Sequence, residues 1–215
     1  MDQSLFHFIN EKWTHPALDL FMAAISDIDV WKPLLVMIIL AALVFGGFKA
    51  RACIVCLAIS MLIAQQVTKV LKSAIDRDRP KHVQNVRMVR LEKGHPEFMS
   101  LFKPPVVRRS DQSDRHRGDP SFPSGHMTNN TVVAICLSLF YRRGWFYWIL
   151  TALIGYSRIY LGAHWPSDVI GTVLLAAGET FLILAALELI WRWATPKWLP
   201  TIFARHPTLV VNPSR

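Results

Sequence analysis

The chain has few cysteines, and it lacks a recognisable leader. Only 3 of its 215 residues are cysteine, and all three lie inside apolar stretches, so we expect buried thiols and no disulfide framework. Cys53 and Cys56 are spaced as C-x2-C, but no second ligand pair accompanies them, which argues against a zinc or redox site. The N-terminus lacks a basic start followed by an apolar run, so no cleavable signal peptide is expected.

Acidic residues are also scarce. The chain carries 15 acidic against 24 basic residues, a formal net charge of +9. In a soluble protein this excess would favour nucleic-acid binding. Here the charges lie between apolar stretches, so the expected partners are anionic lipid head groups and phosphorylated substrates, with no nucleic acid among them. The oligomeric state is not indicated.

Long apolar runs are what the chain has instead. It is 52% hydrophobic with a positive mean hydropathy. A bilayer core of about 30 Å needs about 20 apolar residues in a helix. The first, second and fifth runs satisfy this directly, and the third and fourth do so if adjoining motif residues form their helix ends. The five runs are 31–48, 52–70, 131–141, 145–154 and 169–190.

The tryptophans support a membrane location over the alternative of a large soluble helical core. They gather at the ends of apolar runs, where amphipathic rings prefer the bilayer interface; these are Trp31, Trp145, Trp148, Trp191 and Trp193. Residues 1–27 are interrupted by polar residues and predict an amphipathic helix in the interface, with a sixth span as the alternative. We therefore predict an all-α integral membrane helical bundle of five to six transmembrane helices with an N-terminal interfacial helix, in a single domain over residues 1–215.

Three short segments carry charged and polar residues at fixed spacings. The first is K-x6-R-P, with Lys72, Arg79 and Pro80. The second is Pro123-Ser124-Gly125-His126. The third is S-R-x5-H-x3-D, with Ser157, Arg158, His164 and Asp168. Together they resemble the three-part signature of the type 2 phosphatidic acid phosphatase (PAP2) superfamily, with every signature position filled across about residues 60–175.

The resemblance assigns His164 as nucleophile, Asp168 as its partner and His126 as general acid. A carboxylate that accepts the second N–H of an imidazole fixes the reactive tautomer, and the i, i+4 spacing suits this pairing. Lys72, Arg79 and Arg158 look like a phosphate clamp, because cations oppose the charge of the transition state. Ser124 and Gly125 would add a hydroxyl donor and close approach at a helix N-terminus. No metal or other cofactor is predicted.

These roles imply a metal-independent lipid phosphatase that works through a phosphohistidine. Bacterial members that the chain resembles act on undecaprenyl diphosphate, phosphatidylglycerophosphate, phosphatidic acid or lipid A phosphates. One alternative is a lipid-to-lipid phosphotransferase with the same site, and a less favoured one is an anion transporter. A vanadate-dependent oxidase shares the motifs, but the apolar spans argue against it.

Alternating the direction of five spans puts all three motifs on one side of the membrane. Short basic connections on the other side indicate that the active site is extracytoplasmic, in a bacterial cytoplasmic (inner) membrane. The loop 76–120 would then be extracytoplasmic and the tail 195–215 cytoplasmic. We expect this loop either to contact the head group, with Arg108 and Arg109 as candidates, or to be a solvated insertion. For Glu179, within the fifth run, we expect a polar contact with Gln65 or Gln66.

Overall fold

The computed structural model describes residues 2–115 and 118–210; Met1 of the N-terminal segment, residues 116–117 of the long loop and residues 211–215 of the tail lie outside the described part. Its helices and strands, in chain order, are α1 (Asp2–His7), a π-helical turn (Phe8–Lys12), α2 (Pro16–Ser26), α3 (Ile28–Phe45), α4 (Phe48–Ile75), α5 (Pro80–Val83), β1 (Arg87–Arg90), a 3-10 helix (Glu97–Phe102), β2 (Val106–Arg109), a 3-10 turn (Gln112–Arg115), α6 (Gly125–Phe140), a 3-10 turn (Gly144–Phe146), α7 (Tyr147–Tyr160), α8 (Pro166–Trp198) and α9 (Pro200–Arg205).

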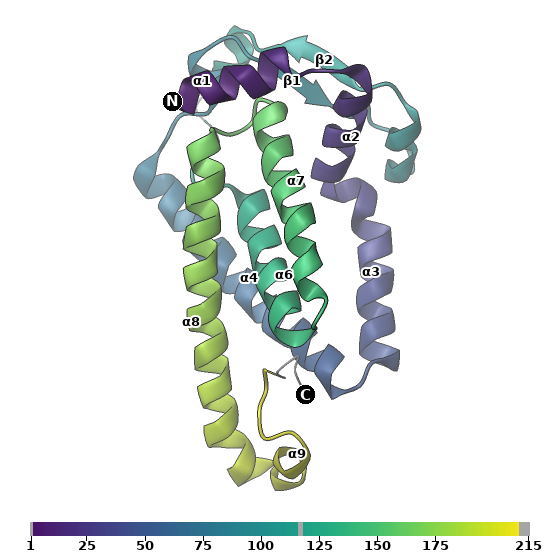
Figure 1. Cartoon of the computed structure of the whole chain (residues 1–215), viewed down its shortest axis with the longest axis vertical. Helices are drawn as coiled ribbons and strands as arrows, with labels where there is room; N and C mark the ends of the chain where they lie inside the picture. The colour runs from purple at the N-terminus through teal and green to yellow at the C-terminus, as the bar shows by residue number, and fades with distance from the viewer. Residues whose placement is uncertain (1, 116–117, 211–215) are drawn as a thin grey trace.

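Each of the five apolar runs lies within or overlaps one long helix of a bundle. α3, α6, α7 and α8 run roughly upright in Figure 1, α4 crosses obliquely behind them, and α6 packs against α4, α7 and α8. The predicted extension of the third and fourth runs into their motifs is correct, since α6 begins at Gly125 and α7 continues to Tyr160. The sequence therefore placed the helices of the bundle and the motif residues at their ends.

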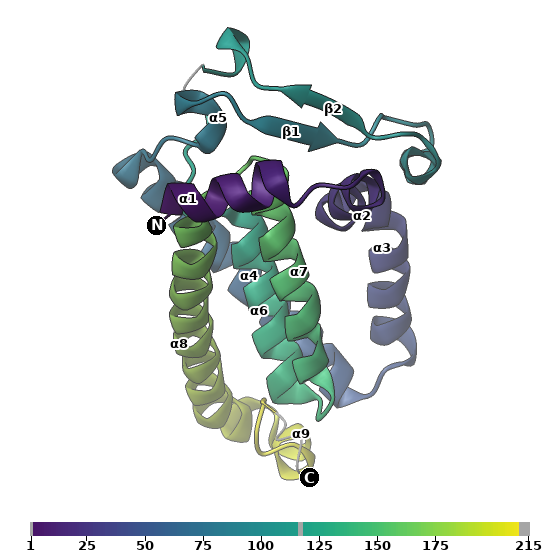
Figure 2. The same cartoon turned by 45° about the horizontal axis from the view of Figure 1, so that its top comes forward.

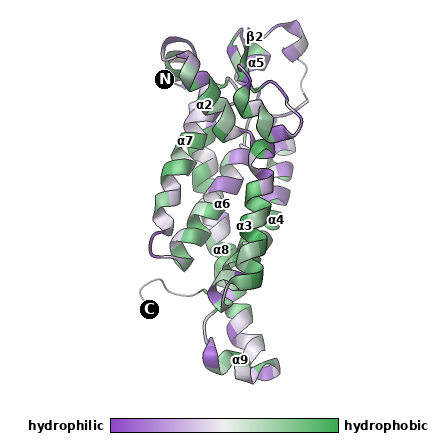
Figure 3. Ribbon diagram, turned by 90° about the vertical axis from the view of Figure 1, so that its right-hand side faces the viewer, coloured by the Kyte–Doolittle hydropathy of each residue, from purple (hydrophilic) through white to green (hydrophobic). Residues whose placement is uncertain are grey.

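The outer surface of the bundle suits a lipid environment. Figure 3 shows apolar helices with polar residues concentrated towards the two ends. Along α3 only Val30 is buried, and a row of large apolar side chains is exposed. Within the described residues, three stretches are long and apolar enough to cross a membrane: Ile28–Phe45, Phe48–Val83 and Pro166–Trp198. α6 and α7 have 16 and 14 residues, so the count of five to six spans stays a prediction.

The N-terminal segment is broken where we expected one interfacial helix. Pro16 starts α2, and the side chain of His15 caps it by accepting a hydrogen bond from the N–H of Ala17 at 3.2 Å. α1 lies across one end of the bundle (Figure 2). The buried Asn10 holds this segment down, because its side-chain amide donates to the carbonyls of Arg87 and Tyr160, both at 2.8 Å.

The long loop contains an antiparallel β-hairpin that the all-α prediction did not include. β1 pairs with β2 in the register Arg87↔Arg109 to Arg90↔Val106. These strands have four residues each, too short for a periodic sequence signal. The hairpin is fixed to the bundle, because Asp19 of α2 binds Arg87 at 2.6 Å and accepts the Tyr160 hydroxyl at 2.6 Å. The two strands thus lie over one end of the bundle and are held there by side-chain contacts (Figure 2).

Candidate active site

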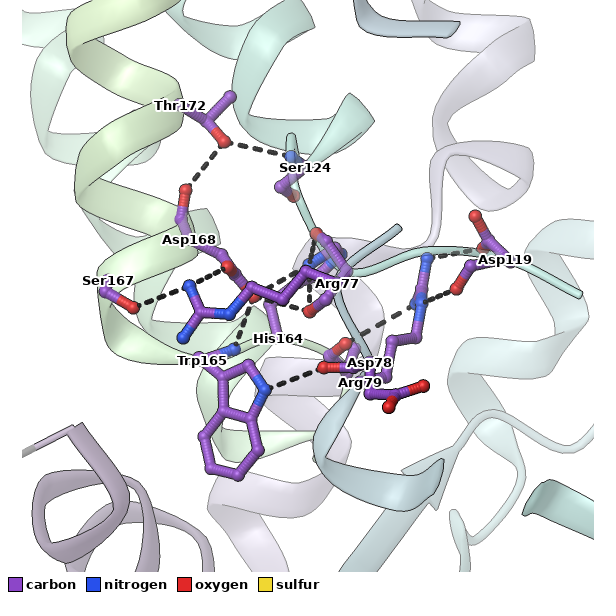
Figure 4. A network of polar contacts seen from close by, with 12 residues as sticks. Arg77, Asp78, Arg79, Asp119, Ser124, His164, Trp165, Ser167, Asp168 and Thr172 are labelled. Carbon is purple, nitrogen blue, oxygen red and sulfur yellow. Dashed lines mark hydrogen bonds and ion pairs between the residues drawn. The ribbon is translucent and has the colours of Figure 1, made fainter. Parts of the chain in front are cut away.

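The three signature segments meet at the end of the bundle that the hairpin covers. Lys72 lies in the last turn of α4, His126 in the first turn of α6, and His164 in the link between α7 and α8. Direct contacts join the segments: Arg79 reaches the carbonyl of Ala163 at 3.5 Å, and the N–H of Ser124 donates to Thr172 Oγ1 at 2.9 Å. Figure 4 shows this network in close-up.

His164 is buried and held as a neutral imidazole. Its Nδ1 lies 2.7 Å from the carbonyl oxygen of Ser121, which can only accept, so Nδ1 carries the proton. Among the described residues Nε2 has no hydrogen-bond partner. Burial, followed by the positive charges of Arg158 and Arg79, lowers the pKa of His164 well below its ordinary value. The free nitrogen is therefore the unprotonated one, as a nucleophile requires.

Asp168 is close to His164 but does not accept a direct hydrogen bond from the Nδ1–H of His164. Asp168 Oδ2 lies 3.9 Å from His164 Nδ1, beyond hydrogen-bond distance. The carboxylate accepts hydrogen bonds from the Ser121 hydroxyl and, at 3.0 Å, from the N–H of Trp165. The direct pairing expected from the i, i+4 spacing is therefore wrong, because the Ser121 carbonyl fills that place. Asp168 contributes its charge and holds Ser121.

Arg77 is a site residue that the sequence did not single out. It binds Asp168 Oδ1 at 2.6 Å, Asp2 Oδ2 at 2.8 Å and Ser167 Oγ at 2.9 Å. Arg77 occupies one of the variable positions of the K-x6-R-P segment. Its position two residues before Arg79 was the available signal, but its partner Asp2 is 75 residues away in the chain. Arg77 neutralises the buried carboxylate beside His164.

Lys72 and Arg79 converge on one carboxylate. α4 ends where Asp76 adopts a left-handed conformation, with φ of 43°, so Lys72 and Arg79 do not share a continuous helix. Both nonetheless bind the side chain of Asp119. Burial raises the pKa of Asp119, but the hydrogen bond from Lys72 and the charges of Arg79 and Lys72 outweigh it, so the pKa lies below its ordinary value. These two cations hold one anion between them, as a phosphate clamp must.

Arg158 completes the set of cations. It is fixed by a hydrogen bond from Nη1 to Ser26 Oγ at 2.5 Å, a contact with the N-terminal segment that no motif spacing could indicate. Arg158, Arg79 and Lys72 act electrostatically on both His126 and His164. The two imidazoles thus share one positively charged environment.

At the N-terminus of α6, Ser124 offers a hydroxyl without a partner among the described residues, and Gly125 leaves space for a ligand to approach the backbone. Ser124 Oγ is buried and has no hydrogen-bond partner among the described residues. A Cβ added to Gly125 would meet no other atom within 4 Å. A hydroxyl donor and uncovered backbone therefore stand where the sequence predicts phosphate binding.

A pocket of about 420 Å³ opens beside these groups. Of the predicted site residues, Arg79, His126 and Arg158 line it, whereas Lys72, Ser124, Gly125, His164 and Asp168 are not among its lining residues. Arg108 and Arg109, our candidates for head-group contact, do not line it. Arg108 forms two hydrogen bonds with Asp114, at 2.6 and 2.7 Å. The hairpin contributes to the pocket through other residues.

Glu179 has no place in this site. Both of its carboxylate oxygens are buried and lack a hydrogen-bond partner among the described residues. Gln65 instead donates to Asn129 at 3.5 Å. The expected contact of Glu179 with Gln65 or Gln66 is therefore wrong.

Comparison with curated proteins gives relatives that are lipid phosphatases. A lipid A 4'-phosphatase of Porphyromonas gingivalis is 27% identical over 219 residues, which cover 98% of this chain and 81% of the relative. An undecaprenyl-diphosphatase of Sulfolobus acidocaldarius is 30% identical, with 83% of this chain and 74% of the relative covered. Undecaprenyl-diphosphatase BcrC of Bacillus subtilis is 37% identical over 76 residues, 35% of this chain and 39% of the relative.

Solved structures share the fold. LpxE of Aquifex aeolicus aligns with a TM-score of 0.61 at 23% identity, over 86% of this chain and 94% of LpxE. A PAP2-type phosphatidylglycerolphosphate phosphatase of Bacillus subtilis aligns with a TM-score of 0.58 at 23% identity, over 89% of this chain and 88% of that one. Residues 53–192, which contain all three signature segments, match the PAP2 superfamily. The chain belongs to the PAP2 superfamily.

Proposed function

We propose that this PAP2-type membrane lipid phosphatase removes a phosphate from a lipid phosphate or diphosphate through a phosphohistidine formed on His164. The observation that supports this most is the meeting of two histidines from distant segments beside the same three cations. A nucleophile, a proton donor and a charge clamp are the parts that phosphoryl transfer needs.

In the first step, Nε2 of His164 attacks phosphorus while the bond to the lipid oxygen breaks. The proton on Nδ1 stays hydrogen-bonded to the Ser121 carbonyl, and the positive charge that develops on the ring is opposed by Asp168, whose carboxylate is 3.9 Å away. The bound phosphate offsets the cations that otherwise disfavour a proton on His126, and His126 protonated in this way gives its proton to the leaving oxygen, so that an alcohol or a lipid phosphate departs. Lys72, Arg79 and Arg158 stabilise the charge on the phosphoryl oxygens, with Lys72 and Arg79 exchanging Asp119 for the phosphate.

In the second step, water attacks the phosphohistidine and the P–N bond breaks. His126, now neutral, takes a proton from the water, which restores both histidines and releases inorganic phosphate. The buried site favours this chemistry, because cations act more strongly on the phosphoryl group where water is excluded.

For the location, we propose a bacterial cytoplasmic membrane with the site on its extracytoplasmic face. Short basic connections support this orientation: Lys49 and Arg51 lie in the first turn of α4, directly after its short connection to α3, and Arg142 and Arg143 lie between α6 and α7. Both connections are at the opposite end of the bundle from the hairpin (Figure 1), and short basic loops mark the cytoplasmic side. The lipid tail would stay beside the apolar helices while the head group enters under the hairpin.

The names of the relatives and the family resemblance define the first substrates to test. Purified protein in detergent should be given lipid A phosphate, undecaprenyl diphosphate, phosphatidylglycerophosphate and phosphatidic acid, each with and without an unphosphorylated acceptor lipid. We expect inorganic phosphate from at least one substrate without any acceptor. Loss of phosphate from the substrate only when the acceptor is present, with that phosphate recovered on the acceptor lipid and not as inorganic phosphate, would identify a phosphotransferase. No turnover of any lipid phosphate would contradict the proposal.

A further inference from the structure

The pocket beside His126 is larger than one phosphate group needs. At about 420 Å³ it is in the range of pockets that enclose a whole small molecule. One side is the chemical site already described. The other sides come from β1 and the residues after it, and from the junction of α2 with α3. A substrate head group that reaches His126 would extend into this space.

Apart from Arg158, three cations that line this pocket form no ion pair among the described residues; one of them, Lys93, attracts Asp29, and the other two are Lys81 and Arg90. Lys81 and Arg90 both line it, and neither forms an ion pair with any residue in 2–115 or 118–210. Lys81 is instead repelled by Arg79 and Arg90. Asp114 and Asp119 also attract Lys81. However, Asp114 is already bound by Arg108, and Asp119 by Lys72 and Arg79.

The absence of an ion pair sets Lys81 and Arg90 apart from four arginines at the same end of the bundle. Arg77, Arg79, Arg87 and Arg108 each bind a carboxylate. Two unpaired cations that line one wall of a pocket favour an anion bound from outside the chain, since that anion would relieve their mutual repulsion. A lone surface lysine would not support this inference, whereas two cations from different elements on one pocket do.

The far wall carries the opposite chemistry. Asp27 and Asp29, at the start of α3, also line the pocket; Asp29 is paired with Lys32, and Asp27 accepts a hydrogen bond from the N–H of Asp29. Carboxylates accept hydrogen bonds from hydroxyl and amide groups and repel a phosphate. An anion would therefore settle on the Lys81 and Arg90 side, while the spacer between two anionic groups would offer hydroxyls or amides to the acidic side.

We propose that Lys81 and Arg90 form a second anion subsite, which binds a phosphate of the substrate head group other than the one that reacts. The preferred substrate would be a lipid with two phosphates separated by a hydroxyl-rich, sugar-like spacer. This inference rests on the proposed function and adds the substrate class to it. Lys81 and Arg90 would act on substrate affinity, and the signature residues on the chemical step.

The test compares one glucosamine-disaccharide lipid carrying two phosphates with the same lipid carrying one. For each, kcat/KM is measured with the wild type, Lys81→Ala and Arg90→Gln. We expect each substitution to lower the ratio of kcat/KM for the bisphosphate over the monophosphate by about tenfold, as loss of one charge-assisted hydrogen bond would. The matched control is Arg109→Ala, an exposed arginine on the paired strand outside the pocket, which should leave the ratio as it is in the wild type.

Two results would overturn the subsite. An unchanged ratio in both variants would show that neither cation contacts a second phosphate. A loss confined to an isoprenyl diphosphate would mean that the second anion is the adjacent phosphate, with no spacer. Failure of the wild type to release phosphate from any lipid would instead contradict the proposed function. Equilibrium binding of the bisphosphorylated lipid to the wild type and to Lys81→Ala would then still decide the subsite.

Discussion

Arg77 offers the sharpest test of how the nucleophile is supported. Its guanidinium joins Asp168, whose side chain is 0% exposed, to Asp2 in the N-terminal helix. In Arg77→Ala the buried carboxylate would keep its hydrogen bonds from Ser121 and from the N–H of Trp165 but lose its only cationic partner among the described residues. A buried carboxylate without a counter-ion is costly, so the folded state should lose stability.

The size of this loss follows from the geometry. Removing one partner of a fully buried ion pair costs about 3–5 kcal/mol. The Arg77 side chain is 37% exposed, so water can partly replace it, and we expect about 2–3 kcal/mol. For a chain of 215 residues this corresponds to a fall in Tm of about 4–12 °C. Activity should fall as well, because Asp168 would shift towards its protonated form.

Thermal unfolding in detergent measures the first effect, and phosphate release below the Tm measures the second. The matched control is Arg192→Ala, which removes an i, i+4 ion pair with Glu188 whose arginine is 57% exposed. Such a pair contributes about 0.3–0.5 kcal/mol. If Arg77→Ala lowers the Tm no more than Arg192→Ala does, Arg77 is not the support of Asp168 that we describe.

Three further predictions concern charge, metal and sidedness. The pKa of His164 is lower in the folded protein than in the unfolded chain, so below the unfolded pKa of about 6.5 the unfolded chain binds a proton that the folded protein does not, and stability falls as pH falls. Acidification from about pH 7.5 to about pH 5.5 should therefore destabilise the wild type by about 1 kcal/mol more than it destabilises His164→Asn. Equal shifts in Tm for the two proteins would contradict this. Protein cations supply the charge of the clamp, so turnover should survive EDTA and vanadate should inhibit it; complete loss with EDTA and recovery with one added metal would refute this mechanism. A cysteine substituted at the exposed Glu97 should react with an impermeant thiol reagent on intact cells once any outer membrane is permeabilised, and a cysteine at Arg143 should not. The native cysteines are buried and should give little background labelling. The reverse pattern would place the site in the cytoplasm.

The sequence was most informative where chemistry depends on local spacing. The helices of the bundle could be predicted from uninterrupted apolar runs, because a helix in lipid must satisfy its own backbone and be apolar outside. Pro166 at the start of α8 and Gly125 at the start of α6 marked helix ends correctly. The signature then placed His126 and His164 at the same end of the bundle.

Contacts between distant segments were beyond such reasoning. Arg158 is held by Ser26, 132 residues away, and Arg77 by Asp2. Neither partner lies in a motif, and no periodicity links them. The i, i+4 spacing suggested that Asp168 accepts a hydrogen bond from His164, but the segment that carries Ser121 brings a backbone carbonyl closer to Nδ1 of His164 than the carboxylate of Asp168 is. A spacing rule gives the side chains that can meet, and the packed structure decides which do.

The central claim, that His164 is the nucleophile, is tested most directly by phosphate release from the preferred lipid by purified His164→Ala. Its thermal unfolding, measured on the same sample, establishes that the protein is folded. We predict that kcat falls by about 10³-fold or more, because the covalent step has no other nucleophile. Substantial turnover by a folded His164→Ala protein would contradict the account.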